Sequence, residues 1–167
     1  MTLYGGASTT KFASQIFLDG NFDPNGEMAG LAIDRRLLRL GWGFTLEAEG
    51  QLCQFAGNHT YTVGSLGLGI RYNFAWRLGK PASLALYTGP SYTNDPPLIG
   101  VGFNDEHLKF EGIKLLNYVG VELAFAMPGT QRWDGVLRIY HRSGAFGLYS
   151  IAADEGSAIG LGVRVRL

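Results

Sequence analysis

Two side chains near the end of the chain, His141 and Ser143, have the types and spacing of a general base and a nucleophile. They are two residues apart, so on an extended strand both side chains leave the same face, while Arg142 leaves the other. Glu155 follows after an irregular segment, and a carboxylate there would orient the imidazole. The three residues therefore predict a Ser-His-acid arrangement for nucleophilic attack on an acyl group.

The residues before His141 indicate which face of the predicted strand carries the pair. Odd positions include Leu137 and Ile139, whereas even positions include Arg138 and Arg142. Because side chains alternate along a strand, His141 lies on the apolar face. An apolar face that carries a base and a nucleophile indicates a site next to apolar surroundings.

A hairpin with the last strand would complete this site. The last strand, within 157–167, also has apolar residues at odd positions. If the hairpin tip lies near 147–149, His141 falls opposite Glu155. Ser143 would then lie on the same patch, and the three side chains would stand in the order nucleophile, base and orienting acid.

The elements that must position this pair alternate apolar residues with polar residues or glycine along the whole chain. We predict an all-β fold, an eight-stranded antiparallel up-and-down transmembrane β-barrel in which residues 1–167 form a single domain. The arginine-rich segment Arg35–Arg39 is expected to connect the second and third strands, and Thr93–Glu106 is expected to be a long loop. The strands are expected within or close to 3–18, 27–34, 42–53, 60–76, 83–92, 108–126, 133–143 and 157–167.

Composition agrees with such a barrel. The 14 basic and 14 acidic residues balance, so charge gives no indication of nucleic-acid binding. The 25 glycines, 13% aromatics and only 17% charged residues are typical of closed antiparallel barrels. The sequence contains no run of 18 apolar residues, so it predicts no transmembrane helix. A membrane strand, however, needs only about 9 to 11 alternating residues.

Other residues with chemical potential have simpler interpretations. The single cysteine, Cys53, cannot form an internal disulfide and is expected to fill a small space. His59 and His107 lie in predicted loops and are expected to be exposed. No metal or cofactor is expected. The first residues lack the charged n-region and apolar h-region of a signal peptide, so such a peptide was removed or never existed.

Two patterns favour a membrane barrel over a soluble one. The polar faces carry charges of both signs, which would pair inside a narrow closed barrel, whereas a soluble carrier would need an apolar interior. The charges are Glu47, Glu49, Arg71, Glu122, Arg138, Arg142, Arg164 and Arg166. Aromatic residues gather where an up-and-down topology places one rim, as in an interfacial girdle. They are Trp42, Phe44, Phe74, Trp76, Phe125 and Trp133.

The C-terminal third resembles the PagL family of outer-membrane lipid A 3-O-deacylases. That family has a His-x-Ser pair near the end of the seventh strand and an acidic residue twelve positions after the Ser. His141, Ser143 and Glu155 match this pattern, since 155 minus 143 is 12. The segment 108–111, Leu-Lys-Phe-Glu, and Arg138, three residues before the His, are also similar.

The resemblance implies an esterase of the bacterial outer membrane that needs no metal or cofactor. Ser143 would attack the acyl ester at the 3-position of lipid A, with His141 as base and then acid and Glu155 fixing the imidazole. The implied partners are lipid A or lipopolysaccharide in the outer leaflet and other membrane lipids. A homodimer stays open at this point.

One position departs from the family. Gly144 stands where the family usually has Asn after the Ser, and residues 144–154 contain no Asn. In the family such an Asn helps to stabilise the oxyanion. Since it is absent here, the backbone N–H groups of Gly144 and Gly147 are the candidates for that role.

Two non-enzymatic alternatives remain. The first is a non-catalytic eight-stranded outer-membrane barrel that has a structural role or binds through its loops, and the missing Asn favours it. The second is a soluble lipocalin-like carrier, which the charged inner face opposes.

Overall fold

A computed structural model of the chain describes residues 1–9, 24–57, 59–75, 81–95, 113–130, 132–145, 148 and 154–166. These residues form eight strands, which confirms the predicted number. The strands are β1 (Thr2–Thr9), β2 (Gly26–Gly41), β3 (Phe44–Gly57), β4 (Tyr61–Ala75), β5 (Pro81–Thr93), β6 (Leu115–Ala126), β7 (Trp133–Ser143) and β8 (Asp154–Val165).

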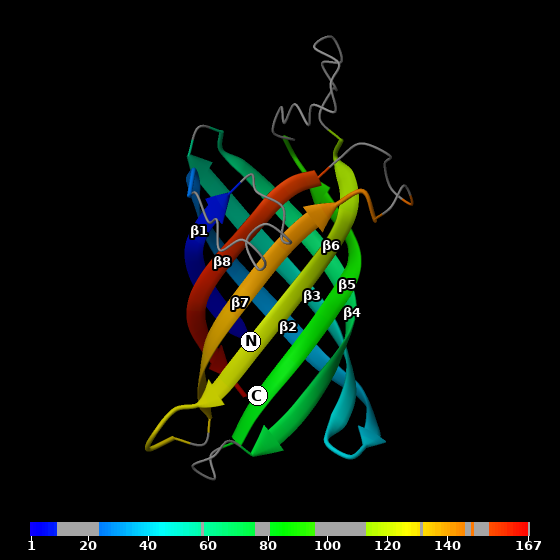
Figure 1. The fold of residues 1–167 in the computed structure, drawn as a ribbon, viewed down its shortest axis with the longest axis vertical. Helices are drawn as coiled ribbons and strands as arrows, with labels where there is room; N and C mark the ends of the chain where they lie inside the picture. Colours follow the sequence, from blue (N-terminus) through cyan, green and yellow to red (C-terminus); the bar gives the residue numbers. More distant parts are fainter. Residues whose placement is uncertain are drawn as a thin grey trace.

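The strands form a closed barrel in sequence order, and every neighbouring pair is antiparallel (Figure 1). The first and last strands close it, with Leu3 opposite Val163. The turns β2–β3 and β6–β7 lie at the lower end in Figure 1, whereas β7 ends and β8 begins at the upper end. The predicted all-β, up-and-down barrel is therefore confirmed.

The β2–β3 connection differs from the predicted one. The expected basic connection, Arg35–Arg39, lies inside β2, which continues to Gly41. Trp42 and Gly43 form a two-residue turn, with φ angles of 49° and 86°. Positive φ at both central residues matches the twist of the flanking strands. A run of arginines is compatible with a strand here because these side chains lie on the exposed end of the ribbon.

Side chains alternate between the two faces as the sequence predicts, and the inner face is charged. In β3, the odd-numbered Glu47, Glu49 and Gln51 are buried, whereas Leu52 on the other face is exposed. Among the described residues, the buried acids are Glu47, Glu49, Glu122 and Asp134, and the buried bases are Arg71, Arg138, Arg142 and Arg164. Charges of opposite sign are thus enclosed in similar measure, as a closed barrel of low dielectric requires.

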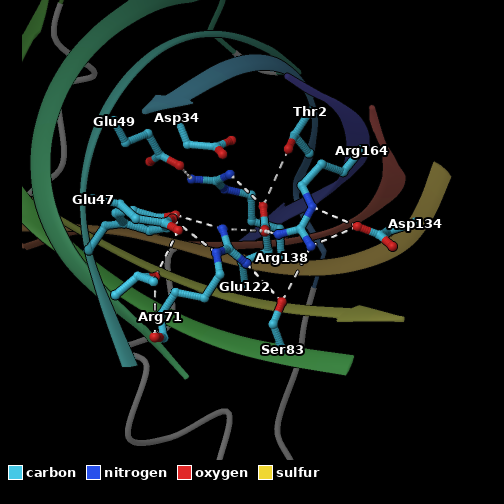
Figure 2. A network of polar contacts seen from close by, with 12 residues as sticks. Thr2, Asp34, Glu47, Glu49, Arg71, Ser83, Glu122, Asp134, Arg138 and Arg164 are labelled. Atoms are coloured by element: carbon cyan, nitrogen blue, oxygen red, sulfur yellow. Dashed lines mark hydrogen bonds and ion pairs between the residues drawn. The ribbon is translucent and has the colours of Figure 1, made fainter. Parts of the chain in front are cut away.

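Glu122 lies at the centre of the resulting network, which Figure 2 shows. Its carboxylate accepts hydrogen bonds or ion pairs from Arg71 at 3.0 Å, Arg138 at 3.0 Å and Arg164 at 2.9 Å. Each arginine also contacts a second acid, namely Glu47 for Arg71, Glu49 for Arg138 and Asp134 for Arg164. The network therefore links β3, β4, β6, β7 and β8 through side chains.

Glycines on the inner face make room for tyrosine rings. A Cβ at Gly120 would lie 1.8 Å from the Tyr118 hydroxyl oxygen, and one at Gly30 would lie 2.3 Å from the Tyr4 ring. The Tyr118 hydroxyl in turn donates to Glu49 at 2.9 Å. The high glycine content thus follows in part from packing large polar rings in a narrow barrel.

The outer face is apolar over most of its height. Its exposed side chains include Leu31, Leu52, Leu66, Leu68, Ile70, Leu84, Leu86 and Leu161. Aromatic residues gather near the short turns, where Phe44 stacks on Tyr72 and Tyr72 stacks on Phe74, and Trp42 is 96% exposed. Trp76, expected in the same girdle, lies outside the described residues. Within the described ranges there is no helix with the length and hydropathy to cross a membrane.

Candidate functional site

The candidate base and nucleophile lie on the outer face of β7, close to its end. His141 and Ser143 are both half-buried, whereas Arg142 between them is buried inside the barrel. The predicted shared face of the pair is therefore present. This end of β7 lies away from the short β6–β7 turn, at the upper end in Figure 1.

The register of β7 and β8 differs from the expected one. His141 lies opposite Ser157 rather than Glu155. The pairing shifts between Arg142, which lies opposite Gly156, and Ser143, which lies opposite Asp154. Glu155 is therefore the extra residue of a β-bulge, and the adjacent Gly156 has the positive φ, 93°, that glycine adopts at little cost.

Glu155 stands next to the site along the chain but is not opposite the histidine. Its backbone belongs to β8, and its side chain lies outside the described residues. A bulged residue leaves the simple alternation of faces, so parity counting does not apply to it. The acid of the predicted triad therefore stays a prediction.

The backbone and one side chain of β8 hold the imidazole of His141. Its Nδ1 atom lies 3.1 Å from the Gly156 carbonyl oxygen and 3.1 Å from the Ser157 hydroxyl oxygen. A carbonyl oxygen only accepts hydrogen bonds, so this contact requires the hydrogen on Nδ1. The lone pair of the neutral ring then lies on Nε2, the nitrogen that would act as a base.

Sequence reasoning missed Ser157, which is 3% exposed and whose hydroxyl contacts Nδ1 of the ring. Both Ser143 and Ser157 flank His141, but they differ in access, because Ser143 is half-buried and Ser157 is nearly covered. A nucleophile must be reached by its substrate, so Ser143 suits that role better, whereas Ser157 suits holding the imidazole. Gly156 after Glu155 was the available signal in the sequence, because a glycine there permits a bulge, and the bulge is what brings Ser157 opposite His141.

The neighbouring strand contributes further polar side chains to the same outer face. Asn117 on β6 is the cross-strand partner of Ser143. Its side-chain amide contacts the hydroxyl oxygen of Thr88 on β5, with Nδ2 at 3.2 Å and Oδ1 at 3.3 Å. We call Thr88, Asn117, His141, Ser143 and Ser157 the outer polar patch. Asn117 and Thr88 were not singled out from the sequence.

The oxyanion candidates have different outcomes. Gly144 is buried directly after β7, next to Ser143. Gly147 lies outside the described residues, as do His107, the similar segment 108–111 and most of the predicted loop Thr93–Glu106. Their predicted roles stay predictions.

The remaining candidates lie away from the outer polar patch. His59 is half-exposed and its Nε2 atom lies 3.3 Å from the Asp95 carboxylate. Cys53 is buried inside the barrel, with its Sγ atom 3.0 Å from the Tyr4 hydroxyl oxygen. In the part of the chain that the structure describes, no three His, Cys, Asp or Glu side chains gather as a metal site would require.

Comparison with known proteins supports the architecture. No protein-family model matches the chain, and no curated protein sequence matches it. The chain is similar to a solved structure described as the crystal structure of the outer membrane enzyme PagL, with a TM-score of 0.67. The match has 13% sequence identity and covers 99% of this chain and 98% of the other. At this identity the likeness shows a shared barrel fold.

Proposed function

We propose that the chain is an outer-membrane esterase that hydrolyses the 3-position acyl ester of lipid A. The observation that carries this proposal is the outward placement of His141 and Ser143 at one end of an otherwise apolar outer face. The match of His141, Ser143 and Glu155 to the PagL-family spacing and the barrel shared with that enzyme support it further.

The distribution of polarity supports the membrane part of the proposal. Full burial of an exposed leucine side chain is worth roughly 1.5–3 kcal/mol, and leucines such as Leu66, Leu68 and Leu161 would forgo much of that in water. A contiguous apolar surface of this kind marks contact with a membrane or a partner. Aromatic residues near the short turns agree with the interface on the periplasmic side, which would place the outer polar patch near the outer leaflet.

The chemistry follows from the two outward side chains. Ser143 Oγ adds to the ester carbonyl carbon while His141 Nε2 takes the hydroxyl proton, and the carbonyl electron pair moves to the oxygen. When the tetrahedral intermediate collapses, the alcohol leaves with that proton and Ser143 keeps the acyl group. A water molecule then releases the fatty acid by the same steps, and Ser143 regains its proton.

The contacts of His141 support its role as base. Donation from Nδ1 to the Gly156 carbonyl sets the tautomer that leaves the lone pair on Nε2. Glu155 would stabilise the imidazolium that forms during the reaction, as the acid does in other triads. A lipid substrate suits a site on the outer surface, since its acyl chains already lie beside the barrel.

The test is mass spectrometry of lipid A after incubation with detergent-folded protein. Wild type should release one 3-hydroxyacyl chain, Ser143→Ala should fall to background, and His141→Ala should lose about 10²–10⁴-fold. Ser8→Ala is the matched control, because Ser8 lies at the same end of the barrel on β1. Undiminished release by Ser143→Ala would contradict the proposed nucleophile.

A non-catalytic barrel is the second candidate. Gly144 in place of Asn and the contact between His141 and Ser157 favour it, because the patch could simply be a set of polar groups that satisfy one another. No acyl release by a protein that shows the heat-modifiable gel migration of a folded barrel would select this alternative.

A further inference from the structure

Asn117 occupies the position on β6 directly beside the proposed nucleophile. The β6–β7 register pairs Asn117 with Ser143, and both alternate with inward residues that are buried. Side chains of directly opposed residues on one face lie with Cβ atoms roughly 4.5–5.5 Å apart. The Asn117 side chain therefore starts beside the place where an ester carbonyl bonded to Ser143 Oγ would lie.

Thr88 fixes that amide from the next strand. Pro90 is the direct cross-strand partner of Asn117 on β5, and its side chain has no polar atom that could bind the amide. The amide instead lies diagonally across to Thr88, where Nδ2 is 3.2 Å from the hydroxyl oxygen. A side-chain amide has two N–H donors, and one contact of this kind engages one of them.

The proposed reaction needs a donor at this place. Negative charge develops on the carbonyl oxygen when Ser143 adds, and a donor aimed at it lowers the barrier most in apolar surroundings. Val119, the cross-strand partner of His141, and Ile139 on β7 are apolar neighbours on the same outer face, so bulk water stabilises such a charge less well here. With Gly144 after Ser143, that residue supplies no side-chain donor.

Resting on the proposed esterase function, we propose that Asn117 donates a hydrogen bond from Nδ2 to the oxyanion formed at Ser143. Thr88 is the positioning residue that holds the amide. The step is that of the proposed mechanism: the Ser143 Oγ–carbon bond forms, the carbonyl electron pair moves to oxygen, and His141 holds the proton. Asn117 gains or loses no proton and acts only by donation.

The test measures kcat and KM for a long-chain p-nitrophenyl ester and for lipid A with folded variants. Asn117→Ala should lower kcat by about 10²–10³-fold with KM little changed, because the donor acts on the transition state. Asn117→Asp keeps the shape but removes both N–H donors, so it should be as impaired as the alanine variant. Asn25→Ala is the matched control, since Asn25 precedes β2 on the opposite side of the barrel.

Thr88 is tested by exchange of its hydroxyl. Thr88→Val is nearly isosteric but cannot bind the amide, so kcat should fall by a smaller factor than in Asn117→Ala. Thr88→Ser keeps the hydroxyl and should therefore keep most of the wild-type kcat. If the role of Thr88 were purely structural, both variants would instead change the heat-modifiable gel migration, and the size of the change would follow the change in side-chain volume.

The outcomes separate this inference from the function on which it rests. Full kcat in folded Asn117→Ala, together with turnover that depends on Ser143, would overturn the role of Asn117 and leave the esterase intact. Full kcat in Asn117→Asp alone would show that N–H donation is not what Asn117 contributes. Absence of any turnover that depends on Ser143 would overturn both.

Discussion

The barrel interior and the outer polar patch place polar groups in opposite ways. Inside, buried carboxylates and guanidinium groups contact one another, and Glu122 alone meets three arginines. Outside, the patch consists of hydroxyl, amide and imidazole side chains, without a carboxylate or guanidinium group, and these side chains are half-buried or exposed except for Ser157. The interior network therefore ties strands together, whereas the patch presents polar atoms to whatever lies beside the barrel.

The difference shows which polar groups need a functional explanation. A charge removed from water is costly unless it is paired. Ion pairing is therefore a sufficient reason for the charged side chains inside the barrel. Five polar side chains on an apolar outer face have no such requirement, since leucine or valine would suit an apolar neighbour better. Their placement is the reason to assign chemistry to the patch and stability to the interior.

Glu122→Ala should have the largest effect on stability. It removes the shared acceptor of Arg71, Arg138 and Arg164 inside the barrel, and breaking a buried pair costs about 3–5 kcal/mol. The free energy of unfolding from urea titration in detergent measures the loss. The activity per folded molecule should stay close to that of wild type.

Glu27→Ala is the control for this variant, because Glu27 is exposed on β2 and its removal should change stability by less than about 0.5 kcal/mol. A Glu122→Ala protein that unfolds like wild type but loses turnover would contradict the assignment of stability to the interior and of chemistry to the outer polar patch.

Local alternation predicted the eight strands and the faces of their charged and apolar residues, but not every strand end. The side-chain period of a strand is two, so Glu47 and Glu49 could be placed inside and Leu66 and Leu68 outside from the sequence alone. The same rule placed His141 and Ser143 together. The rule failed at Arg35–Arg39. The charged residues there suggested a loop, but the strand continues to the Trp42-Gly43 turn.

Contacts between strands could not be predicted in the same way. The alternation along β7 and β8 does not fix the register between them, and the bulge at Glu155 shifts it, so Ser157 rather than Glu155 lies opposite His141. Asn117 was missed for a similar reason, because only the β6–β7 register brings it beside Ser143. Such pairings depend on the closed barrel as a whole.

Leu68→Arg tests whether the outer face contacts a bilayer. Leu68 lies in the middle of β4, and arginine at the midplane of a membrane barrel costs about 2–4 kcal/mol. Leu38→Arg is matched, because both leucines are 58% exposed but Leu38 lies near the end of β2 and should cost about 0–1 kcal/mol. The measurement is the free energy of unfolding from phospholipid vesicles. Equal effects at the two positions would argue against a membrane-spanning barrel.

Gly156→Ala should reduce both stability and turnover. Gly156 has φ of 93°, and a side chain in this region costs about 1–3 kcal/mol. Relief of that strain would move the carbonyl that holds His141 Nδ1, so kcat should fall with stability. Gly64→Ala is the control, since a Cβ there meets nothing within 4 Å. Unchanged kcat in Gly156→Ala would mean that the bulge does not position the imidazole.

Ser157→Ala should have the smallest effect and distinguishes the two serines beside His141. It removes the Ser157 contact at Nδ1 and keeps the Gly156 carbonyl, and a hydrogen bond of this kind contributes about 0.5–1.5 kcal/mol. Turnover should therefore fall by only about 2- to 12-fold, since 1.4 kcal/mol is a factor of ten. Ser143→Ala, measured in the same assay, should reach background. If instead Ser157→Ala abolishes acyl release and Ser143→Ala does not, the nearly covered serine is the nucleophile, and access to it must come from movement of His141.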